Sequence, residues 1–240
     1  MMERVKVTSP RFMARLAGVF YLLTFVTGGF AIFARHGLVV DGDAAATATN
    51  IVAHESLFRL GTAGDLLVVA WYVAVTALFY ILFKPVSKAG SLLAACFSLV
   101  GCAILGFTCL FQLAPFVALQ GAQYSSVFRV EQLQALAYMS LDLYGQTYSI
   151  AVVFFGFYCL LIGWLIFKST FLPRILGALM VLAGLGWLTF LSPPMVKSLS
   201  PYILAPGIVG EGSLTVWLLV IGVNASKWQE KSRACQVVGA

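Results

Sequence analysis

Six long apolar stretches dominate this 240-residue chain, and the short segments between them are basic on one side only. The stretches cover approximately residues 12–34, 60–83, 89–119, 138–167, 175–191 and 204–223. Each reaches the roughly 17 residues that a helix needs to cross the hydrocarbon of a bilayer. Their apolarity is continuous rather than alternating, and a barrel of six strands would leave backbone groups unpaired in lipid. The sequence therefore predicts an all-α, polytopic membrane protein: a bundle of six transmembrane helices in three hairpins, forming one domain with residues 224–240 as a cytoplasmic tail.

The composition supports lipid as the solvent for much of the surface. The chain is 61% hydrophobic and 10% charged, whereas a soluble domain is typically about 45–50% apolar and about 25% charged. The net charge of +6 does not indicate nucleic-acid binding, because the Lys and Arg residues flank the apolar runs, where they anchor next to anionic headgroups. The five cysteines include no CxxC pair and predict neither a disulfide framework nor a metal site.

The basic residues also predict the orientation of the chain. Eleven of them fall on one side: Arg4, Lys6, Arg11, Arg15, Lys84, Lys88, Lys168, Arg174, Lys227, Lys231 and Arg233. The four on the other side are Arg35, Arg59, Arg129 and Lys197. Because cytoplasmic loops carry an excess of Lys and Arg, both termini are predicted to lie in the cytoplasm.

Three carboxylates near the opposite side are the most unusual feature of the apolar runs: Asp65, Asp142 and Glu211. At a rise of 1.5 Å per residue, Glu211 lies about 24 Å, Asp65 about 28 Å and Asp142 about 39 Å from the basic residue at the cytoplasmic end of its own helix. Since the hydrocarbon core is about 30 Å thick, we expect all three in one layer toward the outer face, with Asp142 at the rim.

Polar and small residues follow helical spacing on the faces that carry these acids, and such faces turn away from lipid. An acid at the centre of a membrane helix costs about 2.5–3.5 kcal/mol on insertion scales, so its presence suggests a function. The functional hypothesis is a polar cavity, open to the outside, in which carboxylates bind a cation, a proton or an amine. Its candidate ligand-binding residues are Glu211, Asp65, Asp142, Tyr72 and Tyr21.

A structural explanation of the same acids stays open. If they occupy the first turns of helices that start outside, the helix dipole favours each by about 0.3–1 kcal/mol. Arg35, Arg59 and Arg129 are also available to pair with them.

Other chemistry is weakly represented in the sequence. The two histidines both fall in the first outer loop, and a zinc site usually needs three or four protein ligands. No nucleophile-elbow, HExxH, P-loop or dinucleotide motif occurs. We therefore predict no catalytic residue, no metal and no cofactor, and the sequence favours a non-enzymatic role over an enzymatic one.

Several motifs resemble a known family. They are FFGFYCLLIG at 154–163 followed by LPRILG at 172–177, Gly210-Glu211 followed by Leu214 and Trp217, and RLAG at 15–18 with Tyr21. Together they are similar to the bacterial integral-membrane family called domain of unknown function 4386, over residues 11–223. The resemblance implies a multi-pass protein of the bacterial cytoplasmic (inner) membrane, and its Gly-Glu pair includes Glu211.

Three functions remain open. The first is binding or transport of a small cationic or amphipathic ligand through the outward-facing polar cavity. The second is a structural or assembly role, in which glycine-rich helix faces dock another membrane protein. The third is an intramembrane lipid-modifying enzyme. The expected partners are the lipid bilayer, a small ligand or ion and a membrane protein, but no nucleic acid.

Overall fold

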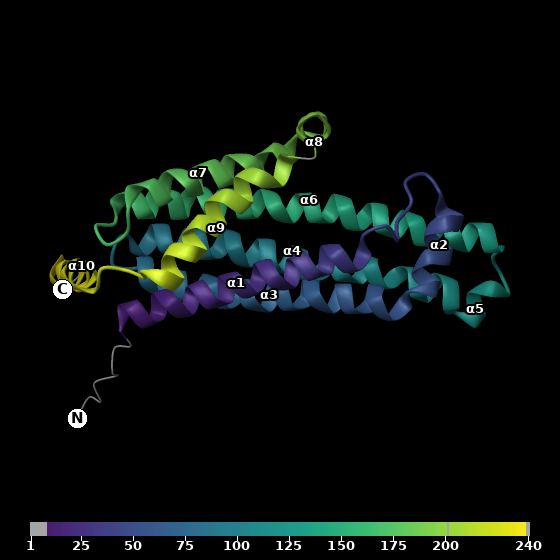
Figure 1. Cartoon of the computed structure of the whole chain (residues 1–240), viewed down its shortest axis with the longest axis horizontal. Coiled ribbons are helices and arrows are strands. Elements are labelled where there is room, and N and C mark those ends of the chain that lie inside the picture. Colours follow the sequence, from purple (N-terminus) through teal and green to yellow (C-terminus); the bar gives the residue numbers. More distant parts are fainter. Residues whose placement is uncertain (1–8, 201, 239–240) are drawn as a thin grey trace, which may run out of the picture. The chain divides into compact units, whose positions relative to one another are not determined.

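The computed structural model describes residues 9–200 and 202–238, and every regular element in that part is helical (Figure 1). Six helices are long and apolar enough to cross a membrane, the last two including short 3-10 extensions. Their α-helical bounds are α1 Pro10–Arg35, α3 Glu55–Phe83, α4 Lys88–Gln120, α6 Val130–Lys168, α7 Arg174–Leu188 and α9 Ala205–Val220. The shorter elements are α2 Ala44–Ala53, α5 Ala122–Ser125, η1 Thr189–Leu191, α8 Pro193–Leu199, η2 Tyr202–Leu204 and α10 Ala225–Val238. The predicted all-α class with six membrane-spanning helices is confirmed.

Some segments expected outside the six runs are also helical. The segment before residue 138 extends α6 back to Val130, and the predicted tail contains α10. In the connection between α1 and α3, α2 begins where the Asp43 side chain accepts a 2.8 Å hydrogen bond from the Ala46 amide, which satisfies one free N–H of the first turn. Arg4 and Lys6 of the basic set and residues 239–240 of the tail lie outside the described residues.

The chain divides into two compact units. Unit 1 comprises Met1–Leu22, Trp71–Gly101 and Val152–Ala240, and unit 2 comprises Leu23–Ala70 and Cys102–Ala151. Helices α1, α3, α4 and α6 therefore contribute one segment to each unit, whereas α7 to α10 belong to unit 1 alone. The single membrane domain expected from the sequence stays a prediction.

Glycines allow the helices of unit 1 to pack with their backbones close together. A Cβ on Gly163 of α6 would lie 2.8 Å from the Gly177 carbonyl oxygen of α7, and a Cβ on Gly177 would lie 2.9 Å from that of Gly163. A Cβ on Gly210 of α9 would collide with the Leu179 carbonyl of α7. Small residues thus allow α7 to pack closely against both α6 and α9. This is expected in a membrane, because the hydrophobic effect does not drive helices together in lipid and close van der Waals packing takes its place.

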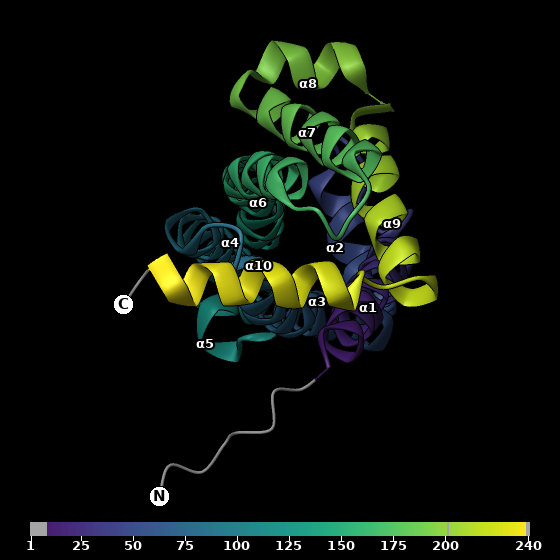
Figure 2. The ribbon, with the colours of Figure 1, turned by 90° about the vertical axis from the view of Figure 1, so that its left-hand side faces the viewer.

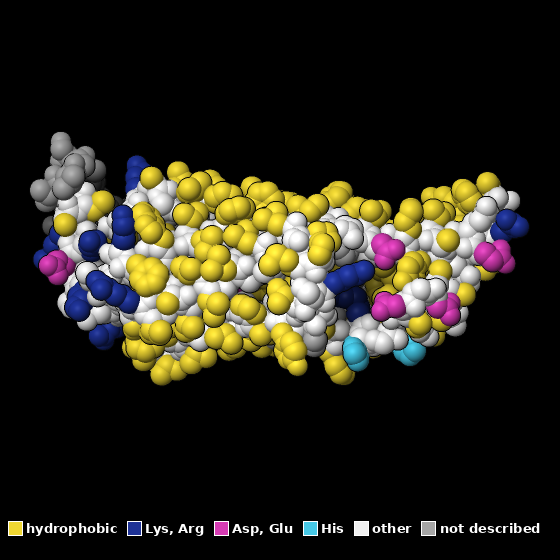
Figure 3. All heavy atoms as spheres, turned by 90° about the horizontal axis from the view of Figure 1, so that it is seen from above, with side chains coloured by type: hydrophobic (Ala, Val, Ile, Leu, Met, Phe, Trp, Pro, Cys, Tyr) yellow, Lys and Arg dark blue, Asp and Glu magenta, His cyan; other side chains and the backbone are white. Residues whose placement is uncertain are grey.

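The short helix α10 forms the terminal layer of unit 1. It runs across the ends of neighbouring helices (Figure 2), and the Trp228 indole N–H donates a 2.8 Å hydrogen bond to the Leu82 carbonyl of α3. On the face seen in Figure 3, Lys and Arg side chains gather at the end that carries α10.

Unit 2 has its own small core. The buried residues Leu38, Ile51, Phe58 and Phe116 form one hydrophobic cluster, in which the rings of Phe58 and Phe116 meet edge to face at 5.6 Å. This cluster fixes α2 and the loop before it against α3 and α4.

Candidate functional site

The backbone around Glu211 is shaped to bring α9 against α7. Glu211 is the seventh residue of α9, which begins at Ala205, and only 6% of the residue is exposed. One turn earlier, Gly207 leaves room for the indole of Trp187 near the end of α7, since a Cβ at Gly207 would overlap that ring. The Gly210-Glu211 pair therefore combines a close helix contact with a carboxylate held inside unit 1.

Three hydrogen-bond donors from three other helices converge on this carboxylate. The Tyr21 hydroxyl of α1 donates to Oε2 at 2.5 Å, and the Tyr72 hydroxyl of α3 donates to the same oxygen at 3.0 Å. The Trp187 indole N–H of α7 donates to Oε1 at 2.6 Å. We call Glu211, Tyr21, Tyr72 and Trp187 the Glu211 cluster. All four belong to unit 1.

Aromatic rings line the cluster beyond its hydrogen bonds. Tyr21 and Tyr72 meet edge to face at 5.6 Å, and the Tyr72 ring lies 4.6 Å from that of Phe155 on α6. Tyr21 also contacts the ring of Phe79 at 5.9 Å. Hydrogen-bond donors are therefore the nearest neighbours of the carboxylate, and aromatic rings form the wall beyond them.

No positive side chain compensates Glu211 within the part of the chain that the structure describes. The ion pairs there, with N–O distances up to 4.0 Å, are Arg35–Asp65 and Arg59–Glu55, both in unit 2. An ionised carboxylate only accepts hydrogen bonds, and three donors stabilise it without neutralising its charge. Chemically, the Glu211 cluster is a site that can take up a proton or a small cation.

The dipole explanation of the three acids is wrong. Asp65 is the eleventh residue of α3, Asp142 the thirteenth of α6 and Glu211 the seventh of α9, so none of them lies in a first turn. The benefit of the helix dipole fades beyond the first turn. The acids that do occupy first turns are Glu55 and Glu131.

Asp65 is compensated within unit 2. Its Oδ2 lies 2.8 Å from Nη1 of Arg35 and accepts a 2.7 Å hydrogen bond from the Gln112 amide of α4. Arg35 also donates to Gln112 Oε1 at 3.4 Å, and its guanidinium carbon lies 5.6 Å from the centre of the Tyr144 ring. The sequence predicts that three arginines are available as partners of the three acids: Arg35, Arg59 and Arg129. The Arg35–Asp65 pair confirms this expectation for one arginine and one acid.

The structure brings some of the candidate residues together and separates others. Glu211, Tyr21 and Tyr72 share one cluster in unit 1, whereas Asp65 and the exposed Asp142 belong to unit 2. The common layer of three acids stays a prediction. In the residues that the structure describes, no group of three or more His, Cys, Asp or Glu side chains is arranged to hold a metal ion.

Sequence reasoning missed Trp187 and Gln112. Each puts a polar group inside an apolar run, and a polar group buried there needs a hydrogen-bond partner. This requirement could have indicated that Trp187 and Gln112 belong to polar clusters, because both side chains donate a hydrogen bond to a carboxylate. Three glycines of the predicted helices, Gly163, Gly177 and Gly210, pack against helices of unit 1 itself.

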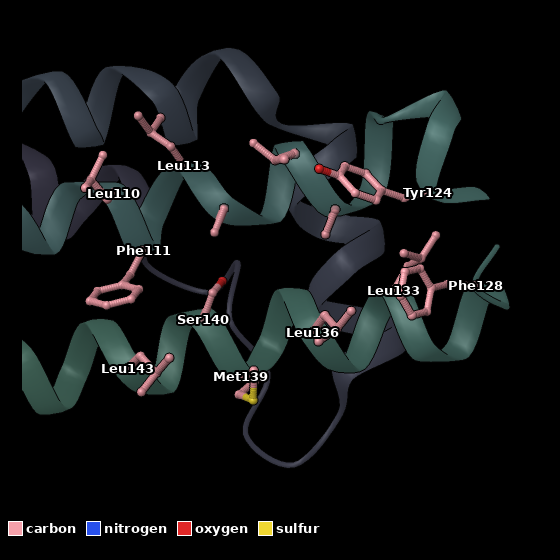
Figure 4. Close-up of a pocket in the computed structure, with 13 residues that line it drawn as sticks. Leu110, Phe111, Leu113, Tyr124, Phe128, Leu133, Leu136, Met139, Ser140 and Leu143 are labelled. Carbon is pink, nitrogen blue, oxygen red and sulfur yellow. The ribbon is translucent and has the colours of Figure 1, made fainter. Parts of the chain in front are cut away.

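Unit 2 contains an apolar cavity of about 760 Å³ between α4, α5 and α6. Its lining is almost entirely hydrocarbon and includes Leu110, Leu113 and Phe111 from α4 and Leu136 and Met139 from α6, with Phe111 extending toward α6 (Figure 4). The hydroxyl-bearing residues of the lining are Tyr124 and Ser140. Such a lining suits an apolar or amphipathic molecule rather than an ion.

These features define a multi-pass, α-helical membrane protein with a buried carboxylate that has no Lys, Arg or His partner in the described part of the chain. The chain belongs to the family described as "Domain of unknown function (DUF4386)", whose sequence model matches residues 16–222. The resemblance found in the sequence motifs is therefore confirmed. A protein of Archaeoglobus fulgidus, described as an uncharacterized protein, is 29% identical over 167 residues, which are 68% of this chain and 85% of that protein. No solved structure matches the chain.

Proposed function

We propose that this protein binds a small cationic ligand, including amphipathic amines, at the Glu211 cluster, as part of a carrier or receptor in the membrane. The observation that supports this most is a carboxylate that is 6% exposed and accepts three hydrogen bonds, with no Lys, Arg or His paired to it among the described residues. Cationic ligands are recognised by this combination of one negative charge and several aromatic faces.

Trp187 is the element of the cluster that a ligand would displace. Tyr21 and Tyr72 are 0% and 7% exposed, whereas Trp187 is half-buried near the end of α7, followed at once by the 3-10 helix η1. A rotation of its indole would free Oε1 of Glu211 while the two tyrosines keep Oε2 in place. In this proposal the polar cavity is closed by Trp187 and opens as the ligand enters.

We further propose that the protein crosses the cytoplasmic (inner) membrane of a bacterium with both termini in the cytoplasm. The proposal rests on the eleven-to-four distribution of basic residues.

The test uses tetramethylammonium and methylammonium as probes on the full-length protein purified in detergent. Binding is followed by tryptophan fluorescence, and a Trp187→Phe variant identifies the part of the signal that comes from Trp187. We expect Glu211→Gln to weaken tetramethylammonium binding at least about 30-fold, because removing one side of a buried charge interaction costs about 2–5 kcal/mol.

The matched control is Asp142→Asn, the same acid-to-amide change at an exposed position of α6. It should leave the affinity within about twofold, since exposed charge interactions contribute about 0–1 kcal/mol. Equal affinities in the wild type and Glu211→Gln, or a larger loss in Asp142→Asn, would refute the proposed site.

A further inference from the structure

The α9–α10 connection forms a rigid turn at the basic end of unit 1. Gly222 has a φ of +74°, a conformation that favours glycine, and the amides of Ile221 and Gly222 both donate to the Trp217 carbonyl at 2.9 Å. Two residues later, the Asn224 amide donates to the Phe171 carbonyl of the α6–α7 link at 3.2 Å. The turn is therefore fixed to that link by a backbone hydrogen bond.

The rotation of α10 about its axis is also fixed. The Asn224 side chain caps the helix by accepting from the Lys227 amide at 3.2 Å. Trp228 is 6% exposed and its indole is hydrogen-bonded to the Leu82 carbonyl, so this side of α10 faces the helix ends of unit 1 (Figure 2). Lys227, Glu230 and Lys231 then share another face, at helical spacings of three and four residues.

Two adjoining hollows lie beside that face. The first, of about 410 Å³, is lined by Thr170 of the α6–α7 link together with Lys227, Glu230 and Lys231. The second, of about 400 Å³, is also lined by Thr170 and Lys227 and adds Arg11. We call the two together the α10 hollow.

The lining of the α10 hollow combines two kinds of surface. Three cationic side chains, from Arg11, Lys227 and Lys231, outnumber the one carboxylate, Glu230. The Thr170 hydroxyl offers a hydrogen-bond donor beside them, which suits the oxygens of a phosphate group. The rest of the lining is mixed: it contains the polar Asn224 and an apolar wall formed by Phe171, Leu172 and, from the membrane-spanning helix α9, Trp217.

We propose that the α10 hollow binds the phosphate headgroup of an anionic glycerophospholipid. The cations and Thr170 would hold the phosphate, and the wall formed by Trp217 would contact the glycerol and the first part of an acyl chain. A free phosphate would use only the polar half, so the apolar wall favours a lipid as the occupant. Basic pockets at the ends of membrane helices recognise such headgroups. This site is separate from the Glu211 cluster and does not depend on it.

The experiment measures lipid binding by native mass spectrometry on the full-length protein in detergent, titrated with phosphatidylglycerol or phosphatidylcholine. The double variant Lys227→Gln/Lys231→Gln should bind phosphatidylglycerol at least about tenfold more weakly than the wild type. The matched control is Lys84→Gln, which removes an exposed charge from the α3–α4 turn of unit 1, outside the hollow. It should leave the affinity within about twofold.

A variant that is expected to bind more tightly distinguishes a specific effect on lipid binding from a loss of binding caused by misfolding. Glu230→Gln removes the one carboxylate of the lining and should bind phosphatidylglycerol about threefold more tightly. Equal losses in Lys84→Gln and the double variant would overturn the proposal, because they would indicate general surface charge. So would equal binding of phosphatidylcholine, an unchanged affinity in Glu230→Gln, or full displacement of the lipid by millimolar inorganic phosphate, which would indicate a free-anion site.

Discussion

Neutralising Asp65 alone in the Arg35–Asp65 pair should lower the free energy of unfolding more than neutralising Asp65 and Arg35 together. The two side chains are 13% and 15% exposed and their charged atoms lie 2.8 Å apart. Gln112 contacts both, because its amide donates to Asp65 at 2.7 Å and its carbonyl oxygen lies 3.4 Å from Arg35. The variants that preserve size are Asp65→Asn, Arg35→Gln and the double substitution.

The expected loss of unfolding free energy in each variant follows from the contacts that remain. Breaking a buried pair costs about 3–5 kcal/mol, and Asp65→Asn leaves the guanidinium of Arg35 without an anionic partner among the described residues, so we expect about 3 kcal/mol. Arg35→Gln leaves the carboxylate its 2.7 Å bond from Gln112, and a bond to a charged group contributes about 1.5–3 kcal/mol. Its cost should be about 2 kcal/mol. The double variant buries no charge and should also cost about 2 kcal/mol, which gives a coupling energy of about 3 kcal/mol.

The assay is reversible unfolding of the purified protein by SDS, analysed as a double-mutant cycle. Arg59→Gln is the control, because the Arg59–Glu55 pair has nearly the same length, 2.7 Å, but its side chains are 47% and 36% exposed. That substitution should cost less than about 1 kcal/mol. A coupling energy below about 0.5 kcal/mol, or equal costs for Arg59→Gln and Asp65→Asn, would refute the argument that burial makes the Arg35–Asp65 pair important.

Three further predictions concern packing, the carboxylate and topology. Gly210→Ala should destabilise the protein by at least about 2 kcal/mol in the same assay, because the added Cβ would collide with α7. The control is Gly212→Ala, whose Cβ would enter open space, and it should be neutral or stabilise the protein by up to about 1 kcal/mol. Tyr72→Phe removes one donor to the carboxylate and should cost about 1.5–3 kcal/mol in SDS unfolding; an unchanged midpoint would argue against that hydrogen bond. A membrane-impermeant maleimide should label the exposed Cys235 only after the cell membrane is opened. The introduced cysteine of Val127→Cys should react in intact cells. The reverse pattern would contradict cytoplasmic termini.

The fold class could be predicted from the sequence because continuous apolarity over a bilayer thickness has one common solution, the helix. The N-terminus of α2 has the same local character, since the cap comes from the adjacent Asp43 carboxylate. These features depend on residues that are close in sequence. The contacts of Gly163 with α7 and of Gly210 with α7 could not be assigned, because many glycines in the chain are compatible with helix packing and periodicity does not select their partners.

The candidate site was predicted in part for the same reason. Depth within an apolar run identified Glu211, and helical spacing put Tyr72 and Tyr21 on inward faces, but neither criterion pairs residues separated by 139 or 190 positions. For Asp65 and Asp142 the dipole explanation failed because apolar runs give poor estimates of where a helix begins. Helix α3 starts five residues and α6 eight residues before the apolar runs that predicted them, so Asp65 and Asp142 lie deeper in their helices than the runs suggested.

The buried Glu211 and the partly buried Asp65 balance the cost of an acid in a membrane helix in two different ways. An acid in a membrane helix costs about 2.5–3.5 kcal/mol, and both carboxylates offset this cost with hydrogen bonds from neutral donors. Asp65 also has Arg35, so its charge is balanced and a cationic ligand would have to compete with a guanidinium already 2.8 Å away. Glu211 accepts hydrogen bonds from two tyrosine hydroxyls and an indole, and among the described residues no Lys, Arg or His pairs with it. A cation that enters its cluster gains a negative partner without displacing another positive charge, and this difference favours Glu211 over Asp65 as the ligand-binding acid.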